Sequence, residues 1–220
     1  MKPLPSWLDL HNEEVVACRL CPRLVAWREK VALKKKRAHM DEEYWGKPVP
    51  AFGDPSALHL IVGLAPAAHG ANRTGQMFTG DRSGDWLFRA LHRAGVANLP
   101  QAQCREDGLR LTGAVIAASC HCAPPDNKPT NEEIANCRPF MLRVLAARPW
   151  RGILCLGGIA WTQLHRNLGT PAPKFGHGAW HRPEGGPKIV ASYHPSQQNT
   201  FTGRLTEPML DAAVMAWLDS

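Results

Sequence analysis

Three polar clusters contain the residues best suited to chemistry in this sequence. The longest is the stretch from 63 to 84, GLAPAAHGANRTGQMFTGDRSG, which includes Asp81. The second cluster contains Asp126 and Asn127, and the third begins at His194. Imidazole and carboxyl groups serve as general acids and bases, and side-chain amides bind and orient reacting groups. If the fold brings the three clusters together, they predict an active site.

Each of these clusters follows a short apolar run that predicts a buried strand. The four runs of this kind are 58–62, 113–118, 153–156 and 188–192, and helices are expected near 84–94, 130–147, 159–168 and 206–218. Alternating strands and helices predict an α/β fold, with a parallel sheet between helices, in one domain over 1–220. Parallel strands end at one edge of the sheet, where ligands bind, so we expect the clusters to meet there. Residues 34–57 and 169–187 are rich in Pro and Gly and are expected to be irregular.

The stretch from 63 to 84 is unusually long and polar for a connection between a strand and a helix, and such loops are usually functional. One alternative is a Gly-rich surface loop without chemistry. Another is a phosphate-binding loop, because the residues from Gly75 to Gly80 have its initial spacing. Asp81 stands where that motif needs a lysine, and an acid there would repel a triphosphate, which argues against this alternative.

The composition suits a globular domain with a nucleic-acid partner. The chain has 220 residues, of which 44% are hydrophobic and 20% charged, and its net charge is +7. The sharpest basic run is Lys34-Lys35-Lys36-Arg37, which is either a solvated surface or a patch that faces DNA. No apolar run reaches the length of a membrane span, and residues 1–6 lack the apolar core of a signal peptide. A cytoplasmic protein without disulfides is therefore expected.

Seven cysteines form a second set of candidate functional residues. Cys18 and Cys21 make a C-x-x-C motif, and Cys120, Cys122 and Cys137 lie in the middle of the chain. In a reducing compartment such clustering indicates a metal or redox site rather than disulfides. Spacing alone leaves zinc and an iron–sulfur cluster open, because four thiolates can bind either.

Several segments together resemble the motifs of the uracil-DNA glycosylase superfamily, and in particular its family 5, or type B. The first motif corresponds to GLAPA, HGANRTG and FTGD between 63 and 81. The segment CAPPDNKPT at 122–130 also matches, and SYHPSQQNTFTGRLT at 192–206 resembles the second motif. The N-terminal CRLCP at 18–22 fits as well, so the resemblance covers nearly the whole chain.

This resemblance implies a three-layer α/β/α fold with a central four-stranded parallel sheet, and it implies a [4Fe-4S] cluster. The cysteines that match the cluster ligands are Cys18, Cys21, Cys122 and Cys137, and Cys120 is left over. We expect the cluster to be structural, because it would join the N-terminal segment to the middle of the chain.

The resemblance also implies that the protein excises uracil from DNA after the target nucleotide has left the duplex for a pocket. His194 would donate a hydrogen bond to the departing base, on which negative charge grows. Asp81 would orient water or favour the sugar cation, Asn127 would hold the base or a water, and Phe78 would stack on the base. The implied pocket wall is Gly63, Leu64, Ala65, Pro66, Ala67 and Asn72, and the implied DNA contacts are Gln198, Asn199 and Arg204.

Three alanines depart from the better-known branches of the superfamily. Ala65 replaces an acid or amide that would activate water, so Asp81 or Asn127 must take over that role. Ala67 replaces a tyrosine that excludes thymine, and Ala118 replaces an asparagine that reads uracil. We therefore expect a roomier pocket that accepts hypoxanthine and xanthine as well as uracil, with no ranking among the three bases.

Two other functions compete with excision. Ala65 would also suit a non-catalytic iron–sulfur protein that binds nucleic acid, although the intact Asp81, Asn127 and His194 argue against it. A zinc hydrolase would need His or carboxylate ligands with an open position, and no H-E-x-x-H motif occurs. The expected partner is double- or single-stranded DNA that contains deaminated bases, and the protein is expected to be a monomer.

Overall fold

The computed structural model describes residues 4–220, and residues 1–3, part of the segment in which no signal peptide is predicted, lie outside it. Its centre is a sheet with the strand order β1-β3-β2-β4-β6-β5. The four inner strands are parallel, and they are β2 (His59–Gly63), β3 (Ala114–Ala118), β4 (Gly152–Leu156) and β6 (Lys188–Ser192). Each matches one of the predicted strands to within one residue at either end.

The inner strands form because their apolar side chains are buried on both faces of the sheet. Along β2, Leu60 and Val62 lie in one core and Ile61 lies in the other. Leu60 is opposite Val115 of β3 on one side and Ile153 of β4 on the other, which places β2 inside the sheet. Strands buried on both faces read as continuous apolar runs, and for this reason the sequence predicted them.

Two short strands complete the edges of the sheet. β1 (Phe52–Gly53) pairs antiparallel with β3, and β5 (Trp180–His181) pairs antiparallel with β6. Both lie in segments predicted to be irregular, so the expected four-stranded parallel sheet describes the inner strands only. A two-residue strand is too short to show a periodic pattern, and its pairing depends on a partner that lies far away in the sequence.

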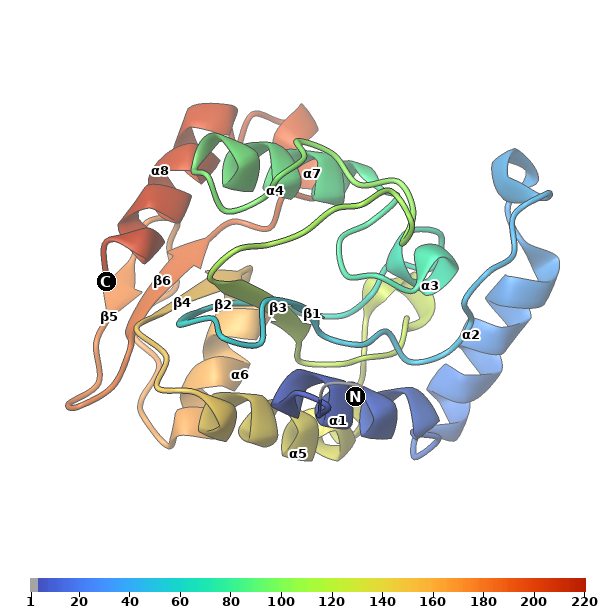
Figure 1. The fold of residues 1–220 in the computed structure, drawn as a ribbon, viewed down its shortest axis with the longest axis horizontal. Coiled ribbons are helices and arrows are strands. Elements are labelled where there is room, and N and C mark those ends of the chain that lie inside the picture. Colours follow the sequence, from blue (N-terminus) through green and yellow to red (C-terminus); the bar gives the residue numbers. More distant parts are fainter. Residues whose placement is uncertain (1–3) are drawn as a thin grey trace.

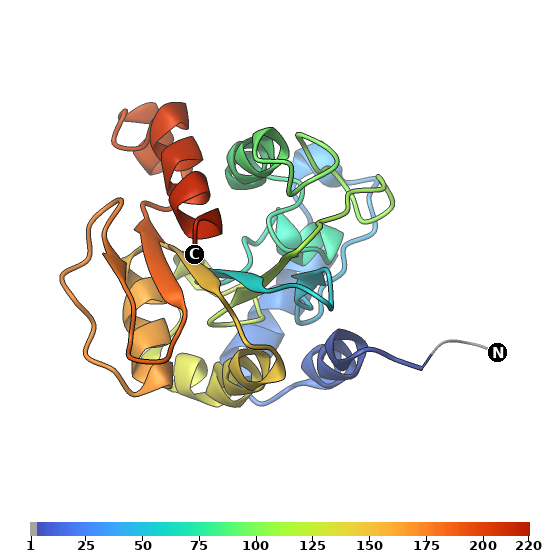
Figure 2. The same ribbon diagram turned by 60° about the vertical axis from the view of Figure 1, so that its left-hand side comes forward.

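Helices cover both faces of the sheet, as expected for a three-layer fold (Figures 1 and 2). On one face lie α4 (Arg82–Arg93), α7 (Gln197–Phe201) and α8 (Glu207–Leu218), and on the other lie α1 (Trp7–Ala17), α5 (Asn131–Ala147) and α6 (Gly158–Leu168). The remaining helical segments are α2 (Pro22–Lys34), α3 (Ala71–Thr74), η1 (Arg37–His39) and η2 (Pro125–Asn127). Within residues 4–220, every helix is too short or too polar to span a bilayer.

Local signals in the sequence set several of these helix boundaries. Pro22 is the first residue of α2, a position at which the backbone N–H has no partner within the helix, so proline loses nothing there. The C-x-x-C motif before it forms the connection between α1 and α2. The predicted capping box of α5 is confirmed. Glu133 N donates to Thr130 Oγ1 at 3.2 Å, and Thr130 N donates to Glu133 Oε2 at 2.7 Å. Glu133 also pairs with Arg23, which attaches α5 to α2.

Candidate active site

A cavity of about 400 Å³ opens where β2, β3 and β6 end. The predicted site residues along its wall are Gly63, Leu64, Ala65, Pro66, Ala67, Phe78, Asp81, Asn127, His194 and Gln198. Its other lining residues are Ala71, Met77, Ser83, Ala118 and Ser196. The structure thus brings together residues from all three polar clusters, because the strands that precede them are parallel and end at the same edge.

His194 follows the end of β6 and faces this cavity. Burial lowers the pKa of His194 to about 4, so its imidazole is neutral at physiological pH. A neutral imidazole still donates one hydrogen bond from a ring N–H. The backbone carbonyl of His194 accepts a hydrogen bond from Asn199 Nδ2 at 2.9 Å, which ties the turn after β6 to the start of α7.

His177 supports the same strand end and was not identified from the sequence. Its Nδ1 accepts a hydrogen bond from the backbone N–H of Tyr193 at 3.3 Å, so Nε2 carries the proton that it donates to Met209 O at 3.1 Å. Tyr193 directly precedes His194, and His177 therefore fixes the backbone that presents the catalytic candidate. In the sequence, His177 is one histidine in a Gly/Pro-rich loop, and nothing in that pattern indicates this contact.

Phe78 forms one wall of the cavity in a strained backbone conformation. Its φ of 56° lies in the left-handed region, which is costly for a bulky residue and is found most often at functional sites. The ring stacks on that of His194, with centroids 5.9 Å apart and planes inclined by 30°. It also lies so close to Gly63 that a Cβ there would be 3.2 Å from the ring. A side chain at position 63 would therefore require the Phe78 ring to shift by a few tenths of an ångström.

Asp81 has two roles in the structure: it lines the cavity, and it caps the start of α4. It is the N-cap residue of α4, and its Oδ1 accepts a hydrogen bond from Gly84 N at 3.0 Å. Burial raises the pKa of Asp81, while backbone hydrogen bonds from Gly84 and Ser83 and the charge of Arg73 oppose this rise. The sequence identified Asp81 as the acid of the site but not as a helix cap.

Because Asp81 caps α4, two substitutions of this residue should differ in their effect on the free energy of unfolding. We expect Asp81→Ala to lower the free energy of unfolding by about 1 kcal/mol, because α4 loses the acceptor for one of its first N–H groups. Asp81→Asn should lower it by much less, since asparagine is an equally good N-cap. Urea denaturation of both variants measures this difference, and equal losses would contradict the capping role.

Asn127 reaches the cavity from a tight turn after β3. It is exposed and ends η2, where it and Asp126 both have left-handed backbone conformations, with φ of 56° and 53°. Asn and Asp are the non-glycine residues that adopt this conformation most readily. Arg23 Nη2 donates to the carbonyl of the next residue, Lys128, at 3.2 Å, so the turn is attached to α2.

Asn72 does not line the cavity, contrary to the prediction that it binds substrate. Its side chain is fully buried on α3, and Nδ2 donates weakly to the carbonyls of Arg28 and Ala68, both at 3.4 Å. The single turn of α3 directs this amide toward α2 and away from the cavity. The structure therefore gives Asn72 a packing position between the loop and α2.

The predicted DNA contacts cluster on and after α7, at the rim of the cavity. Gln198 lines the cavity, whereas the side-chain amide of Asn199 donates its hydrogen bond to the His194 carbonyl. The guanidinium of Arg204 lies 4.5 Å above the ring of Tyr193 and is exposed. Phe201, which was not predicted, is 66% exposed, and Arg82 lies 4.3 Å above its ring. This rim combines aromatic and basic side chains, a combination suited to stacking on bases and pairing with phosphates.

The cysteines that match cluster ligands come from three parts of the chain: the connection between α1 and α2, the loop after β3, and α5. Cys18 ends α1, Cys21 precedes α2, Cys122 follows β3 and Cys137 lies in α5. Cys21 and Cys122 pack together against Leu24, and Cys137 packs against Cys120 and Ile134. All seven cysteines are free thiols. In the part of the chain that the structure describes, no three His, Cys, Asp or Glu side chains converge as the ligands of one metal ion do.

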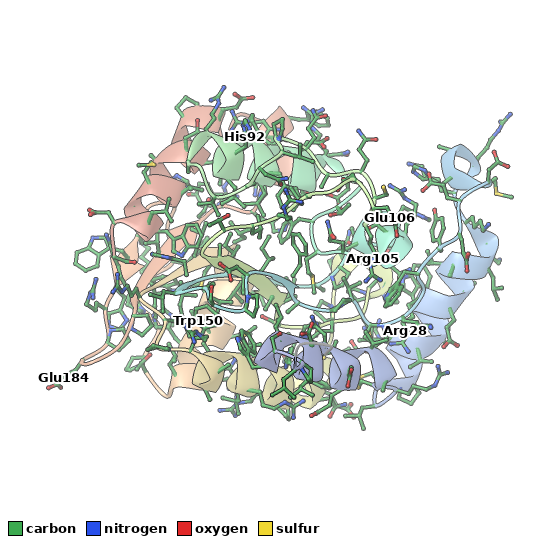
Figure 3. The ribbon with its side chains drawn as sticks, viewed as in Figure 1. Arg28, His92, Arg105, Glu106, Trp150 and Glu184 are labelled. Carbon is green, nitrogen blue, oxygen red and sulfur yellow. The ribbon has the colours of Figure 1, made fainter. Side chains whose placement is uncertain are left out.

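Arg28, which is labelled in Figure 3, places a buried positive charge beside the thiol of Cys122. The residue is 1% exposed, and its Nη1 donates to Cys122 Sγ at 2.8 Å, while its Nε has no hydrogen-bond partner. Among residues 4–220, none of the acidic side chains forms an ion pair with Arg28. A buried cation without a counter-ion is costly, so the site is suited to a group that carries negative charge at the thiols.

The basic run lies at the far end of α2, which projects to one side of the molecule (Figure 1). Lys34, Lys36 and Arg37 are exposed. The backbone N–H of Lys36 donates to the hydroxyl of Tyr44 at 3.3 Å, and this hydroxyl is 3.1 Å from Nδ1 of His69 in the loop after β2. The run is thus connected to the loop that builds the cavity, although it does not line the cavity itself.

Comparison with known proteins agrees with this geometry. A sequence model of the uracil-DNA glycosylase superfamily matches residues 50–218. The chain is 52% identical over 205 residues to a type-5 uracil-DNA glycosylase from Mycobacterium tuberculosis, across 91% of this chain and 76% of that protein. It is 49% identical over 206 residues to a type-5 uracil-DNA glycosylase from Thermus thermophilus, across 92% of this chain and 93% of that protein.

A more distant relative is a type-5 uracil-DNA glycosylase from Pyrobaculum aerophilum, with 44% identity over 201 residues, across 91% of this chain and 88% of that protein. These matches span every segment that lines the cavity, and the chain belongs to the type-5 branch of the uracil-DNA glycosylase superfamily.

Proposed function

We propose that this protein excises uracil from DNA by hydrolysing the bond between the base and its deoxyribose. The observation that carries this proposal is the cavity in which Asp81, Asn127 and His194 converge beside the ring of Phe78. The relatives named type-5 uracil-DNA glycosylases support it. Catalytic groups on three loops around a concave, largely apolar pocket are what a hydrolase of a flipped base needs.

The proposal gives each of these groups a role in the reaction. The flipped base enters the cavity against Phe78, and the bond from the sugar carbon to the base nitrogen breaks through an oxocarbenium-like state. Negative charge develops on the departing base, and His194 stabilises it with a hydrogen bond from its neutral imidazole. Asp81 and Asn127 orient the water whose oxygen joins the sugar carbon and whose proton is released.

The size and lining of the cavity support a substrate range wider than uracil. Ala65, Ala67 and Ala118 line it with small side chains, and its volume of about 400 Å³ leaves room for a purine. Hypoxanthine and xanthine, the deamination products of adenine and guanine, are therefore part of the proposal.

A single assay tests the proposed function against a non-catalytic binding protein. A labelled duplex with one uracil is incubated with the protein and then treated with alkali, which cleaves DNA at the abasic product. Cleavage at the uracil position, absent from a duplex with thymine there, supports excision. A protein that binds the duplex and leaves it intact would be the non-catalytic alternative.

The proposal includes a structural [4Fe-4S] cluster on Cys18, Cys21, Cys122 and Cys137. Four thiols from three parts of the chain suit such a cluster, because each thiolate would bind a different iron and the sulfurs need not converge on one point. A single zinc ion needs all its ligands within about 2.3 Å. The cluster and its thiolates carry negative charge, which would compensate the buried Arg28. Bound there, it would fasten the N-terminal helices to the centre of the chain.

We expect the basic run to add phosphate contacts to those at the rim of the cavity. Replacing Lys34, Lys35, Lys36 and Arg37 by glutamine should flatten the dependence of duplex affinity on salt. The log–log slope should fall by about 0.9 for each phosphate that the protein no longer neutralises. Fluorescence anisotropy with undamaged duplex at several salt concentrations measures the slope.

A charge-matched variant serves as the control for this measurement. It carries glutamine at four exposed arginines outside the cavity and the basic run, Arg138, Arg151, Arg166 and Arg182. Its slope should stay close to that of the wild type. If both variants flatten the slope equally, the effect reflects net charge alone, and the basic run is an ordinary solvated surface.

A further inference from the structure

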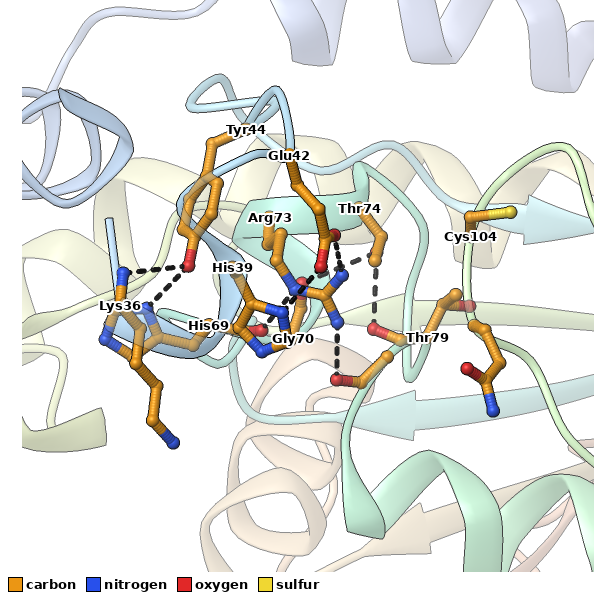
Figure 4. Close-up of polar contacts among 12 residues, drawn as sticks. Lys36, His39, Glu42, Tyr44, His69, Gly70, Arg73, Thr74, Thr79 and Cys104 are labelled. Atoms are coloured by element: carbon orange, nitrogen blue, oxygen red, sulfur yellow. Dashed lines mark hydrogen bonds and ion pairs between the residues drawn. The ribbon is translucent and has the colours of Figure 1, made fainter. Parts of the chain in front are cut away.

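Arg73 is a nearly buried arginine at the centre of the loop after β2, and its side chain is 8% exposed. It contacts three separate segments (Figure 4). Nε donates to the backbone carbonyl of His69 at 2.9 Å, and Nη2 donates to that of Gly80 at 2.9 Å. Nη1 forms an ion pair with Glu42, which lies between η1 and β1. One guanidinium thus joins both ends of the loop and a segment that precedes it.

The two carbonyls that Arg73 binds belong to the residues just before Gly70 and Asp81, and these two residues touch. A Cβ at Gly70 would lie 2.2 Å from Oδ2 of Asp81, so the carboxylate rests directly on the Gly70 backbone. The other oxygen of Asp81 is held by Gly84 N. The backbone on both sides of the contact between Gly70 and Asp81 is therefore fixed by the same side chain.

Gly80 makes room for this guanidinium because it has no side chain. Its φ is +78°, and a Cβ there would lie 2.3 Å from Nη2 of Arg73. The planar guanidinium directs its N–H groups along several fixed directions, whereas a lysine ammonium at the same place is a compact point charge. Only arginine can reach all three acceptors at once, and Glu42 supplies the negative charge that its burial requires.

We propose that Arg73 is a positioning residue that acts through Asp81, holding its carboxylate in the cavity wall where it orients the attacking water. This inference rests on the proposed glycosylase function. It assigns to Arg73, Glu42 and Gly70 a task that the cavity lining does not reveal, because none of the three lines the cavity. A carboxylate displaced by about 1 Å would lose much of its effect on the reaction, by up to about 10²-fold.

A double-mutant cycle separates positioning from general stabilisation. Arg73→Lys should slow single-turnover excision by about 10- to 100-fold and leave affinity for undamaged duplex nearly unchanged. In an Asp81→Asn background, the same substitution should change the rate by less than about twofold, because the group through which it acts is gone. Equal rate losses in the two backgrounds would overturn the proposal, and so would a wild-type rate for Arg73→Lys.

Arg89→Lys is the matched control. Arg89 also lies in a helix, with its side chain 18% exposed, and pairs with two acids, Glu207 and Asp211. Its substitution should lower stability to a similar degree, while its effect on the excision rate should not depend on the residue at 81. If Arg73→Lys fails to fold, Glu42→Gln takes its place in the cycle, since Glu42 is partly exposed and glutamine keeps an acceptor for Arg73.

A structural measurement, which does not depend on activity, distinguishes a failure of this inference from a failure of the proposed function. In a crystal structure of Arg73→Lys, the Asp81 carboxylate should have left its contact with Gly70, and in Arg89→Lys it should remain there. An unmoved carboxylate in Arg73→Lys would overturn the inference even if the wild type excises uracil. A wild type without excision activity would overturn the proposed function, whatever the position of Asp81.

Discussion

His194→Ala should slow single-turnover excision of uracil by about 10²–10⁴-fold, the range for a positioned proton donor or hydrogen-bond donor. Ala65 removes the side chain that would otherwise activate water, so the barrier must be lowered mainly at the departing base. His194 is placed for this, because it lines the cavity and its ring stacks against Phe78. Binding to duplex should change little, since the proposed phosphate contacts lie at the rim and on the basic run.

The pH dependence of the wild type provides a second test of the same role. The pKa of His194 lies at about 4 because the ring is buried, so the imidazole stays neutral as the pH rises through the usual histidine range. The single-turnover rate should therefore show no step near about pH 6.5. A rate that falls as the pH rises through that value would mean that a protonated His194 is the active form.

The comparison must be made under single-turnover conditions, because product release can otherwise mask the chemical step. His92→Ala is the control, since His92 is exposed on α4 and lies away from the cavity (Figure 3). Asp81→Asn and Asn127→Ala should each cost less than His194→Ala, and more when combined. If His194→Ala keeps nearly the wild-type rate while Asp81→Asn abolishes excision, the barrier is lowered mainly by activation of the attacking water. The assignment of roles is then wrong.

Cys122→Ser should abolish the proposed iron–sulfur cluster, whereas Cys120→Ser should keep it. The wild type purified without oxygen should be brown, with broad visible absorbance and about four iron atoms per chain. Cys122 receives the hydrogen bond from the buried Arg28, and it retains slight exposure, as do Cys21 and Cys137. Cys120 is fully buried, in a cluster with Ile134 and Cys137 against which Leu64 and Ala65 of the pocket wall pack.

The two serine variants are a matched pair, because both replace a buried cysteine of the same segment by the same residue. Iron analysis and visible absorbance of each, with thermal unfolding, separate cluster loss from a packing defect. Loss of iron from Cys120→Ser and its retention in Cys122→Ser would reverse the ligand assignment. Stoichiometric zinc without iron in the anaerobic wild type would rule the cluster out.

The sequence by itself determined the inner sheet and the approximate bounds of α4, α5, α6 and α8. The strands buried on both faces appear as apolar runs, and the capping box at Thr130 and Glu133 marks the start of α5, because these signals come from residues that are close together in the chain. Strand order could not be read in this way, yet the rule that parallel strands end at one edge was enough to predict that residues from the three polar clusters meet. The cavity contains members of each.

The tertiary structure alone decided which way individual side chains of the site point. Asn72 lies in the motif loop, but its amide faces α2 because the short helix α3 turns it there. His177 and Arg73 hold the backbone next to His194 and Asp81, although His177 lies in no motif and the motif that contains Arg73 does not indicate what its side chain contacts. The edge strands β1 and β5 exist only through their pairing with β3 and β6. In each case the partner is a backbone group or side chain brought close by folding, and a hydrogen bond between such groups depends on distance and direction in space, which residue type and spacing do not encode.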